Sequence, residues 1–142
     1  MTLAFILIIA HFVGDFLLQS DWMALNKSKR WDALALHVVA YILALYAVLA
    51  SSALLGAWSN PHASFDDHWF YVVNAALHFI TDAITGRITS RLWFLPQVGQ
   101  GMRPEWIQVE VKSTRHWFFV VIGADQVLHY AALFLTASWW LR

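Results

Sequence analysis

Long apolar stretches alternate with short polar segments along the chain. Each stretch is long enough for a helix that crosses a lipid bilayer, which takes about 20 residues. The first contains His11 and Asp15 and lacks the basic leader and the small-residue cleavage site of a signal peptide, so we expect it to be retained. The pattern predicts an all-α, polytopic membrane protein with a four-transmembrane-helix bundle, its spans near residues 3–19, 33–55, 69–87 and 117–141.

The polar segments between the stretches indicate the orientation. All nine tryptophans lie at the ends of the stretches or between them, and indole prefers the membrane interface. Lys and Arg gather in segments 20–32 and 88–116 and are absent from 56–68. This bias predicts that 20–32 and 88–116 are cytoplasmic loops and that both termini lie outside. Within the second loop, we expect an interfacial helix at 88–95 and a short strand at 107–112, where apolar and polar residues alternate.

Composition excludes several classes of protein. The hydrophobic fraction is 60% and the charged fraction 13%, against about 25% charged residues in a typical soluble protein. A water-soluble monomer and a disordered chain are therefore excluded. The formal net charge of zero provides no basic surface for nucleic acid. Since the chain has no cysteine, it forms no disulfides and no cysteine-ligated metal sites. We expect one transmembrane domain over residues 1–142.

Ionisable side chains lie inside the predicted spans, and most of them are paired. In three spans a His and an Asp are four residues apart, so both leave the same face of the helix. The span at 33–55 adds His37, with Tyr41 one turn later. Charges inside a membrane are costly, so these residues indicate a functional site. The three pairs are His11 with Asp15, His78 with Asp82, and Asp125 with His129.

The order within each pair follows the direction of its helix. The spans at 3–19 and 69–87 run inward and read His then Asp, whereas the span at 117–141 runs outward and reads Asp then His. In every case the Asp is nearer the cytoplasm and the His is one turn deeper. We therefore expect one shared site in the cytoplasmic half of the bundle. Asp125 is predicted to lie deeper than the other carboxylates, about 15 Å from Arg115 at 1.5 Å rise per residue.

This predicted cluster has the composition of a metal site. Carboxylates that share a low-dielectric site repel each other unless a cation neutralises them. Mixed His and carboxylate ligands suit a divalent transition metal such as zinc, manganese or iron. Either one ion or two ions that share an Asp fit this composition. The alternative is a structural network of hydrogen bonds without a metal. The predicted metal ligands are His11, Asp15, His37, His78, Asp82, Asp125 and His129.

Residues near the cluster suggest further roles. Gln19 and Gln126 are placed to orient ligands or to hold substrate, although ordinary interhelical hydrogen bonds explain them equally well. Arg87 and Arg91 are four residues apart at the cytoplasmic end of their span. They are candidates for binding an anionic headgroup, or are simply part of the cytoplasmic Lys/Arg bias.

Two glycines adjoin carboxylates of the predicted cluster. Gly14 precedes Asp15, and Gly123 lies two residues before Asp125. Small residues let the backbones of neighbouring helices approach closely inside a membrane. We therefore expect close helix contacts at both positions.

Several separated motifs resemble one known family. The run H-F-V-G-D-F-L-L-Q-S-D-W-M-A-L-N-K-S-K at 11–29, the pair Leu36-His37, the motif H-F-I-T-D at 78–82 and the motif D-Q-V-L-H at 125–129 carry the resemblance, which covers nearly the whole chain. The family comprises small multi-span membrane proteins of bacteria and phages described only as a domain of unknown function. The resemblance implies a helical protein of the bacterial inner (cytoplasmic) membrane and no specific activity. A weaker likeness, limited to the His/Asp helices, is to membrane-bound metal-dependent hydrolases.

The leading functional hypothesis is a metal-dependent hydrolase that acts on a lipid-linked or phosphate-bearing substrate. A bound metal activates water and polarises the scissile group. Asp21 or Asp125 is the candidate catalytic general base, while Arg87 or the basic cluster at 27–30 would hold negative charge.

Three alternatives have different consequences. Haem held by histidines of several helices would make the protein an electron carrier. A His/Asp relay would make it a proton or cation transporter, although the predicted outer half of the bundle is almost free of ionisable groups. Finally, the protein would be a non-catalytic subunit of a membrane complex or a homo-oligomer if its lateral surface binds partners.

Overall fold

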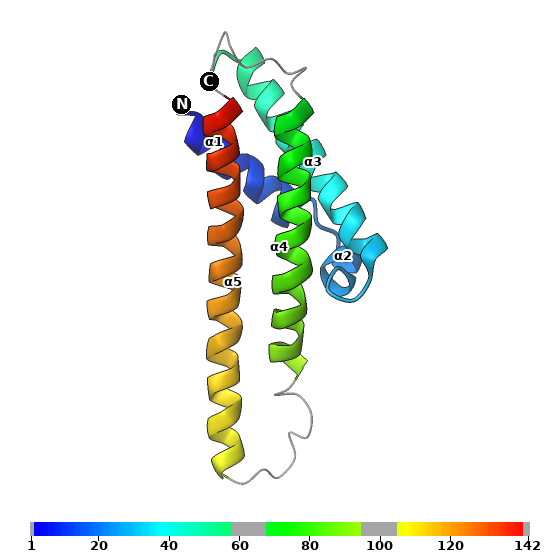
Figure 1. The fold of residues 1–142 in the computed structure, drawn as a ribbon, viewed down its shortest axis with the longest axis vertical. Coiled ribbons are helices and arrows are strands. Elements are labelled where there is room, and N and C mark those ends of the chain that lie inside the picture. The colour runs from blue at the N-terminus through cyan, green and yellow to red at the C-terminus, as the bar shows by residue number, and fades with distance from the viewer. Residues whose placement is uncertain (1, 58–67, 95–104, 141–142) are drawn as a thin grey trace.

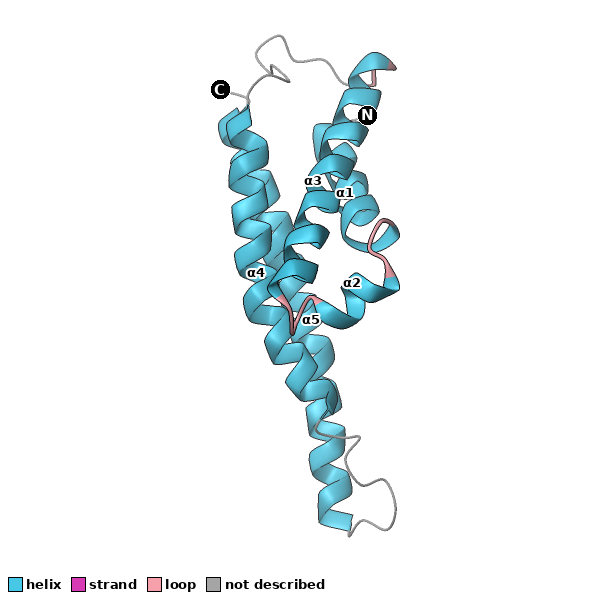
Figure 2. Cartoon of the chain, turned by 90° about the vertical axis from the view of Figure 1, so that its right-hand side faces the viewer, coloured by secondary structure: helices cyan, strands magenta, loops and turns pink. Residues whose placement is uncertain are grey.

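The computed structural model describes residues 2–57, 68–94 and 105–140. These residues form five α-helices and one π-helical turn, without a strand in the described ranges (Figures 1 and 2). The all-α prediction is thereby confirmed. In chain order the elements are α1 (Leu3–Phe12), the π-helical turn η1 (Val13–Leu17), α2 (Asp21–Asn26), α3 (Trp31–Leu54), α4 (His68–Phe94) and α5 (Glu105–Trp140).

Two long antiparallel helices, α4 and α5, form the spine of the molecule (Figure 1). Helix α3 packs against α4 and against α1 and η1, while α1 also contacts α5. The short helix α2 packs against α3. The N-terminal end of α1 and the C-terminal end of α5 lie at the same end of the bundle (Figure 1). One face each of α1, α3, α4 and α5 therefore meets at the middle of the bundle.

The helices extend beyond some of the predicted spans. Helix α4 continues to Phe94, so the expected interfacial helix at 88–95 is the end of α4 and not a separate element. Helix α5 begins at Glu105, and the prediction of a strand at 107–112 is wrong. Alternation over six residues is weak evidence for a strand, because a strand needs a partner to pair with. The predicted loop at 20–32 contains the helix α2.

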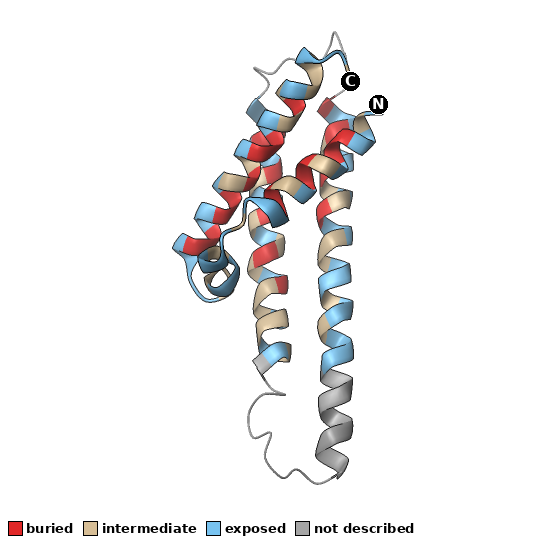
Figure 3. Ribbon diagram, turned by 180° about the vertical axis from the view of Figure 1, so that it is seen from behind, coloured by how far each residue is buried: buried red, intermediate tan, exposed pale blue. Residues whose placement is uncertain are grey.

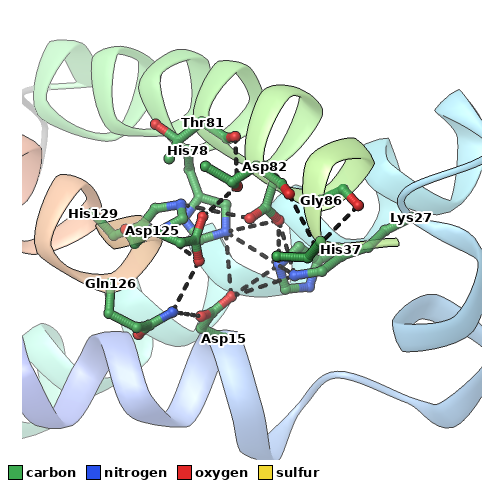
Figure 4. Close-up of polar contacts among 12 residues, drawn as sticks. Asp15, Lys27, His37, His78, Thr81, Asp82, Gly86, Asp125, Gln126 and His129 are labelled. Atoms are coloured by element: carbon green, nitrogen blue, oxygen red, sulfur yellow. Dashed lines mark hydrogen bonds and ion pairs between the residues drawn. The ribbon is translucent and has the colours of Figure 1, made fainter. Parts of the chain in front are cut away.

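Helix α2 turns the chain back toward the bundle after η1. Its N-cap is Ser20, whose hydroxyl accepts a hydrogen bond from the Met23 N–H at 3.3 Å. At its other end, the Asn26 side-chain amide donates to the Trp22 carbonyl at 2.8 Å. The turn that follows brings Lys27 next to the middle of the bundle (Figure 4).

Large apolar side chains cover much of the outward-facing surface of the bundle, while its interior holds both apolar and polar side chains. Buried residues gather where α1 and α3 meet the other helices (Figure 3), and they include four histidines and two aspartates. Outward-facing positions are apolar: Leu43 of α3, Val72 of α4 and Leu135 of α5 are 64%, 54% and 70% exposed. Such extensive apolar surface marks an interaction with lipid or with other proteins.

Two helices among the described residues are long and apolar enough to cross a membrane. They are α3 and the part of α5 from Arg115 to Trp140. The segment Leu3–Leu17 is apolar but shorter. Helix α4 has sufficient length, yet its inward face carries Asn74 and the pair His78 and Asp82, which lowers its hydropathy.

Only one of the two glycines beside the aspartates allows a close helix contact. A Cβ added to Gly14 in η1 would lie 2.9 Å from the Tyr41 ring and 3.1 Å from the Tyr41 Cα. A Cβ added to Gly123 would meet nothing within 4 Å among the described atoms, so the expectation of close packing there is wrong. Gly123 lies on an open face of α5. The close contact at Gly14 holds η1 against α3 and brings Asp15 within reach of that helix.

We predict that Gly14→Ala destabilises the protein, because the new methyl group must push η1 away from α3. Overpacking of this kind costs about 1–3 kcal/mol. Thermal unfolding of the purified protein should show a lower Tm for Gly14→Ala. Gly123→Ala serves as the control and should keep or raise the Tm, since alanine favours a helix over glycine. Equal behaviour of the two variants would contradict the proposed contact.

Candidate metal centre

The seven side chains predicted to share a site meet at the middle of the bundle (Figure 4). His11 comes from α1, Asp15 from η1 and His37 from α3, while α4 and α5 contribute one His/Asp pair each. Six of these side chains are at most 4% exposed, and the Asp125 side chain is 15% exposed. The reversed His/Asp order in antiparallel helices thus places these side chains at the same level of the bundle. Their role as metal ligands stays a prediction.

A π-helical turn presents the first carboxylate. In η1 the Leu18 N–H donates to the Val13 carbonyl at 2.9 Å, five residues back. Such π-turns inside helices are frequent at functional sites. Within this turn, Gly14 permits the close contact with α3 and Asp15 is buried against His37. The local geometry therefore orients Asp15 toward α3 and α4.

Four ligand atoms form a compact set, which we call the four-atom set: Asp15 Oδ1, His37 Nε2, His78 Nε2 and Asp82 Oδ2. The His37 Nε2 lies 3.1 Å from each of the other three atoms. The His78 Nε2 lies 3.6 Å from both carboxylate oxygens. All four atoms are within 4.8 Å of one another. They come from η1 and from the two helices α3 and α4, so only the tertiary fold brings them together.

These separations fit one tetrahedral metal ion. Zinc–nitrogen and zinc–oxygen bonds of about 2.0–2.2 Å place neighbouring ligand atoms about 3.3–3.6 Å apart in a tetrahedron. The five separations that involve His37 Nε2 or His78 Nε2, 3.1–3.6 Å, lie close to that range, and the two carboxylate oxygens lie within 4.8 Å of each other. A proton on His37 Nε2 could serve only one of its three close neighbours, whereas a cation at the centre satisfies all four atoms. The donor set of two imidazoles and two carboxylates suits zinc, manganese or iron.

A lysine that sequence analysis did not assign to the cluster lies against this set. The Lys27 ammonium donates to Asp82 Oδ2 at 3.0 Å and lies 3.3 Å from His37 Nε2 and 3.8 Å from Asp15 Oδ1. Its side chain is only 19% exposed. Lys27 therefore supplies positive charge to both carboxylates of the four-atom set. Sequence analysis named the basic cluster at 27–30, which includes Lys27, as a place to hold negative charge, but it did not predict that Lys27 would reach these buried carboxylates.

A second group of possible ligands shares Asp82 with the first. Asp82 Oδ1 lies 3.7 Å from His129 Nε2, while its other oxygen belongs to the four-atom set. His129 Nδ1 lies 3.5 Å from Asp125 Oδ2 and 3.0 Å from the Asp125 carbonyl oxygen. The group Asp82, Asp125 and His129 is compact enough to hold an ion of its own. Asp82 is thus placed to bridge two ions or to link one ion to His129.

Amide and hydroxyl groups orient the remaining carboxylate oxygens. The Gln126 side-chain nitrogen donates to Asp15 Oδ2 at 3.2 Å and to Asp125 Oδ2 at 3.1 Å. Its oxygen lies 3.1 Å from His11 Nε2. The Thr85 hydroxyl donates a short hydrogen bond to the other Asp125 oxygen. Gln126 therefore links α1, η1 and α5, and its role in orienting ligands or holding substrate stays a prediction.

The imidazole rings are packed against each other and against Tyr41. His78 is stacked on the Tyr41 ring with centroids 3.9 Å apart. The centroids of His78 and His129 are 4.2 Å apart, and those of His37 and His78 are 5.2 Å apart. A porphyrin needs a flat open space between its axial ligands, which these contacts fill. The arrangement favours a metal ion over haem.

Other predicted site residues lie away from the cluster. Asp21 is exposed at the start of α2 and forms no side-chain hydrogen bond or ion pair within the described part of the chain, so the structure does not bring this candidate base into the site. Gln19 is half-buried between η1 and α2, and its Oε1 has no hydrogen-bond partner among the described residues. The Arg87 guanidinium packs over the Trp31 ring at 4.1 Å, and Arg91 is exposed one turn later. Neither arginine contacts the cluster through a described side-chain contact.

The cluster is closed on one side and polar on the other. Toward the chain termini lies the apolar core, which includes Leu7, Leu45 and Leu133, each at most 1% exposed. On the opposite side lies the partly exposed Lys27. A small molecule would therefore approach from the side of α2.

Comparison with known proteins identifies the family. No curated protein and no solved structure matches the chain. One family profile matches residues 3–142, which include all seven cluster residues and Lys27. The chain therefore belongs to the DUF3307 family, which is described as a protein of unknown function.

Proposed function

We propose that the chain is an integral membrane protein with four spanning helices and a divalent transition metal bound by the four-atom set. We further propose that this centre is the active site of a hydrolase that acts on a lipid-linked or phosphate-bearing substrate. The observation that carries the proposal is the near-tetrahedral spacing of two imidazole and two carboxylate atoms inside a bundle with an apolar exterior.

The distribution of side chains supports the location in a membrane. Helices α1, α3, α4 and α5 expose apolar side chains and bury polar ones, which is the arrangement expected where lipid is the solvent. Two of them have the length and composition of spans. Helix α4 would cross with its polar face turned toward its neighbours, and the shorter segment Leu3–Leu17 would cross a locally thin region of the bilayer.

The residues around the metal set supply the other parts of a hydrolytic site. A bound divalent ion would activate a water molecule and polarise a phosphoryl or acyl group. Asp125 is the candidate general base, because its carboxylate lies at the edge of the cluster and is held by Thr85 and Gln126. Lys27 would stabilise negative charge on the substrate. His129, between Asp125 and Asp82, is placed to pass a proton between them.

The closed side of the cluster favours this function over transport. A transporter needs polar groups that continue to both sides of the membrane. Here the apolar core covers the cluster on the side of the chain termini. The polar side chains of Asn74 and Thr136 on that side bond to each other, the Asn74 amide donating to the Thr136 hydroxyl at 2.8 Å. Access from one side suits binding and catalysis.

The first prediction concerns metal content. Purified protein should contain about one zinc, manganese or iron ion per chain by elemental analysis, and a second ion would occupy Asp82, Asp125 and His129. His37→Ala and Asp82→Asn should abolish the ion of the four-atom set, because each removes one of its four ligands. His116→Ala, which changes an exposed histidine outside the cluster, should keep the wild-type content. A folded wild-type protein without stoichiometric metal would refute the proposed centre.

The second prediction concerns topology. Because the chain has no cysteine, single-cysteine variants report the side of the membrane directly. A membrane-impermeant maleimide should label Ser64→Cys, in the predicted outer segment, in intact spheroplasts. It should label Ala24→Cys, on the exposed surface of α2, only after the membrane is opened. Labelling of both variants from the same side would rule out the proposed arrangement of spans.

The third prediction concerns the general base. Asp125→Asn should retain the ion of the four-atom set and lower kcat by about 100-fold or more, as expected for loss of a general base. The assay would measure phosphate release from phosphatidic acid in mixed micelles, with His116→Ala as the control of unchanged activity. If Asp125→Asn hydrolyses the substrate at the wild-type rate, Asp125 is not the base.

A further inference from the structure

A pocket of about 280 Å³ adjoins the cluster on the side of α2. Its walls are the turn after α2, one face of α4 and two residues of α5. From α4 it includes Gly86, Ser90 and Trp93, and from α5 it includes Phe118 and Ile122. None of these residues belongs to the candidate metal centre.

The pocket continues the same helix faces that carry the cluster. On α4, Asp82, Gly86 and Ser90 follow each other at intervals of four residues, so they share one face. On α5, Ile122 lies four residues before Gln126. Lys27 joins the two regions, because its side chain lines the pocket while its ammonium contacts Asp82 at 3.0 Å. The pocket therefore adjoins the four-atom set at Lys27; Figure 4 shows Lys27 and Gly86 on the same side of Asp82 and His37.

One wall of the pocket is cationic and polar. Lys27, Ser28 and Lys29 contribute to it, and no Asp or Glu lines the pocket among the described residues. Ser28 adds a hydroxyl group to this part of the lining. An ammonium group has three N–H donors, so Lys27 can hold Asp82 and still donate to a phosphate group at the pocket, where Ser28 adds a hydroxyl donor.

Another part of the pocket wall is apolar. The rings of Trp93 and Phe118 pack together with centroids 5.0 Å apart, and Leu25 and Ile122 extend this surface. A ligand that fits both walls must carry negative charge at one end and hydrocarbon at the other. The volume is below the usual range of about 300–1,000 Å³ for pockets that enclose a small molecule. It suits a headgroup and the first carbons of its chains, with the rest of the chains outside.

We propose that this pocket is the binding site for the phosphate-bearing headgroup of an anionic lipid. The phosphate lies against Lys27, Ser28 and Lys29, and the glycerol region lies against Trp93 and Phe118. As a substrate site this assignment rests on the proposed hydrolase, because it places the phosphate next to the candidate metal ligands. Lipid binding itself is measured separately from metal content and catalysis.

The test is a binding titration of the purified full-length protein in detergent with dioctanoyl phosphatidic acid, followed by calorimetry. We expect Gly86→Leu to weaken binding about tenfold or more, which is about 1.4 kcal/mol. A Cβ at Gly86 would already lie 3.7 Å from Ser28, so a leucine fills the pocket beside the polar wall. Gly123→Leu is the matched control, because its side chain enters open space and should leave binding unchanged.

Further variants and ligands separate the contributions of charge and hydrocarbon to binding from any effect on folding. Lys29→Gln, at an exposed position, should also weaken binding. Dioctanoylglycerol, which lacks the phosphate, and inorganic phosphate, which lacks the chains, should each bind at least about tenfold more weakly than phosphatidic acid. Equal binding of either probe, or wild-type affinity in both Gly86→Leu and Lys29→Gln, would overturn the assignment.

The outcome is distinguishable from that of the metal proposal. Titrations are made on the protein as isolated and again after chelation, with metal content measured on the same samples. A protein that holds a metal and binds no phosphatidic acid refutes the pocket and leaves the metal centre intact. A protein that binds phosphatidic acid and holds no metal supports the pocket as a lipid site and refutes the hydrolase.

Discussion

Asp15 and Asp82 are buried within a few ångströms of each other in an apolar bundle, and the arrangement around them compensates for their charge. Burial of a single ion costs several kcal/mol even after the protein relaxes. Lys27 lies 3.0 Å from one carboxylate and 3.8 Å from the other, and His37 lies 3.1 Å from both. The turn after α2 is thus held against the bundle by the charge it neutralises. A divalent ion in the same place would compete with the lysine for Asp82.

The rest of the fold positions these two carboxylates. Gly14 lets η1 approach α3 closely enough for Asp15 to reach His37. Tyr41, which stands against Gly14, is also stacked on His78 and so orients the imidazole of the neighbouring helix. Because Gln126 links the second oxygen of Asp15 to Asp125, the two halves of the polar cluster form a connected network. A change at one helix contact will therefore shift the positions of several ligand atoms.

Much of this site could be predicted because it depends on helical periodicity. His11 precedes Asp15, whereas the order is Asp then His in α5. This pattern brings the side chains to one depth if α5 runs antiparallel to the N-terminal helix. Lys27 could not be found this way, since its position depends on a six-residue helix whose direction is set by the Ser20 cap and by packing on α3. The same short helix leaves Asp21 exposed, although its sequence position is close to the cluster. The strand predicted at 107–112 was wrong. An alternating segment with no second strand to pair with can be part of a longer helix, and here α5 runs through it.

The apolar core that includes Leu7, Leu45 and Leu133 forms a layer between the cluster and the end of the bundle near both chain termini. In a bilayer, protons released or taken up by the histidines and aspartates would equilibrate with a single compartment. Such a layer would let the protein hold seven ionisable groups within the membrane without conducting protons across it, so the proton-motive force would be preserved.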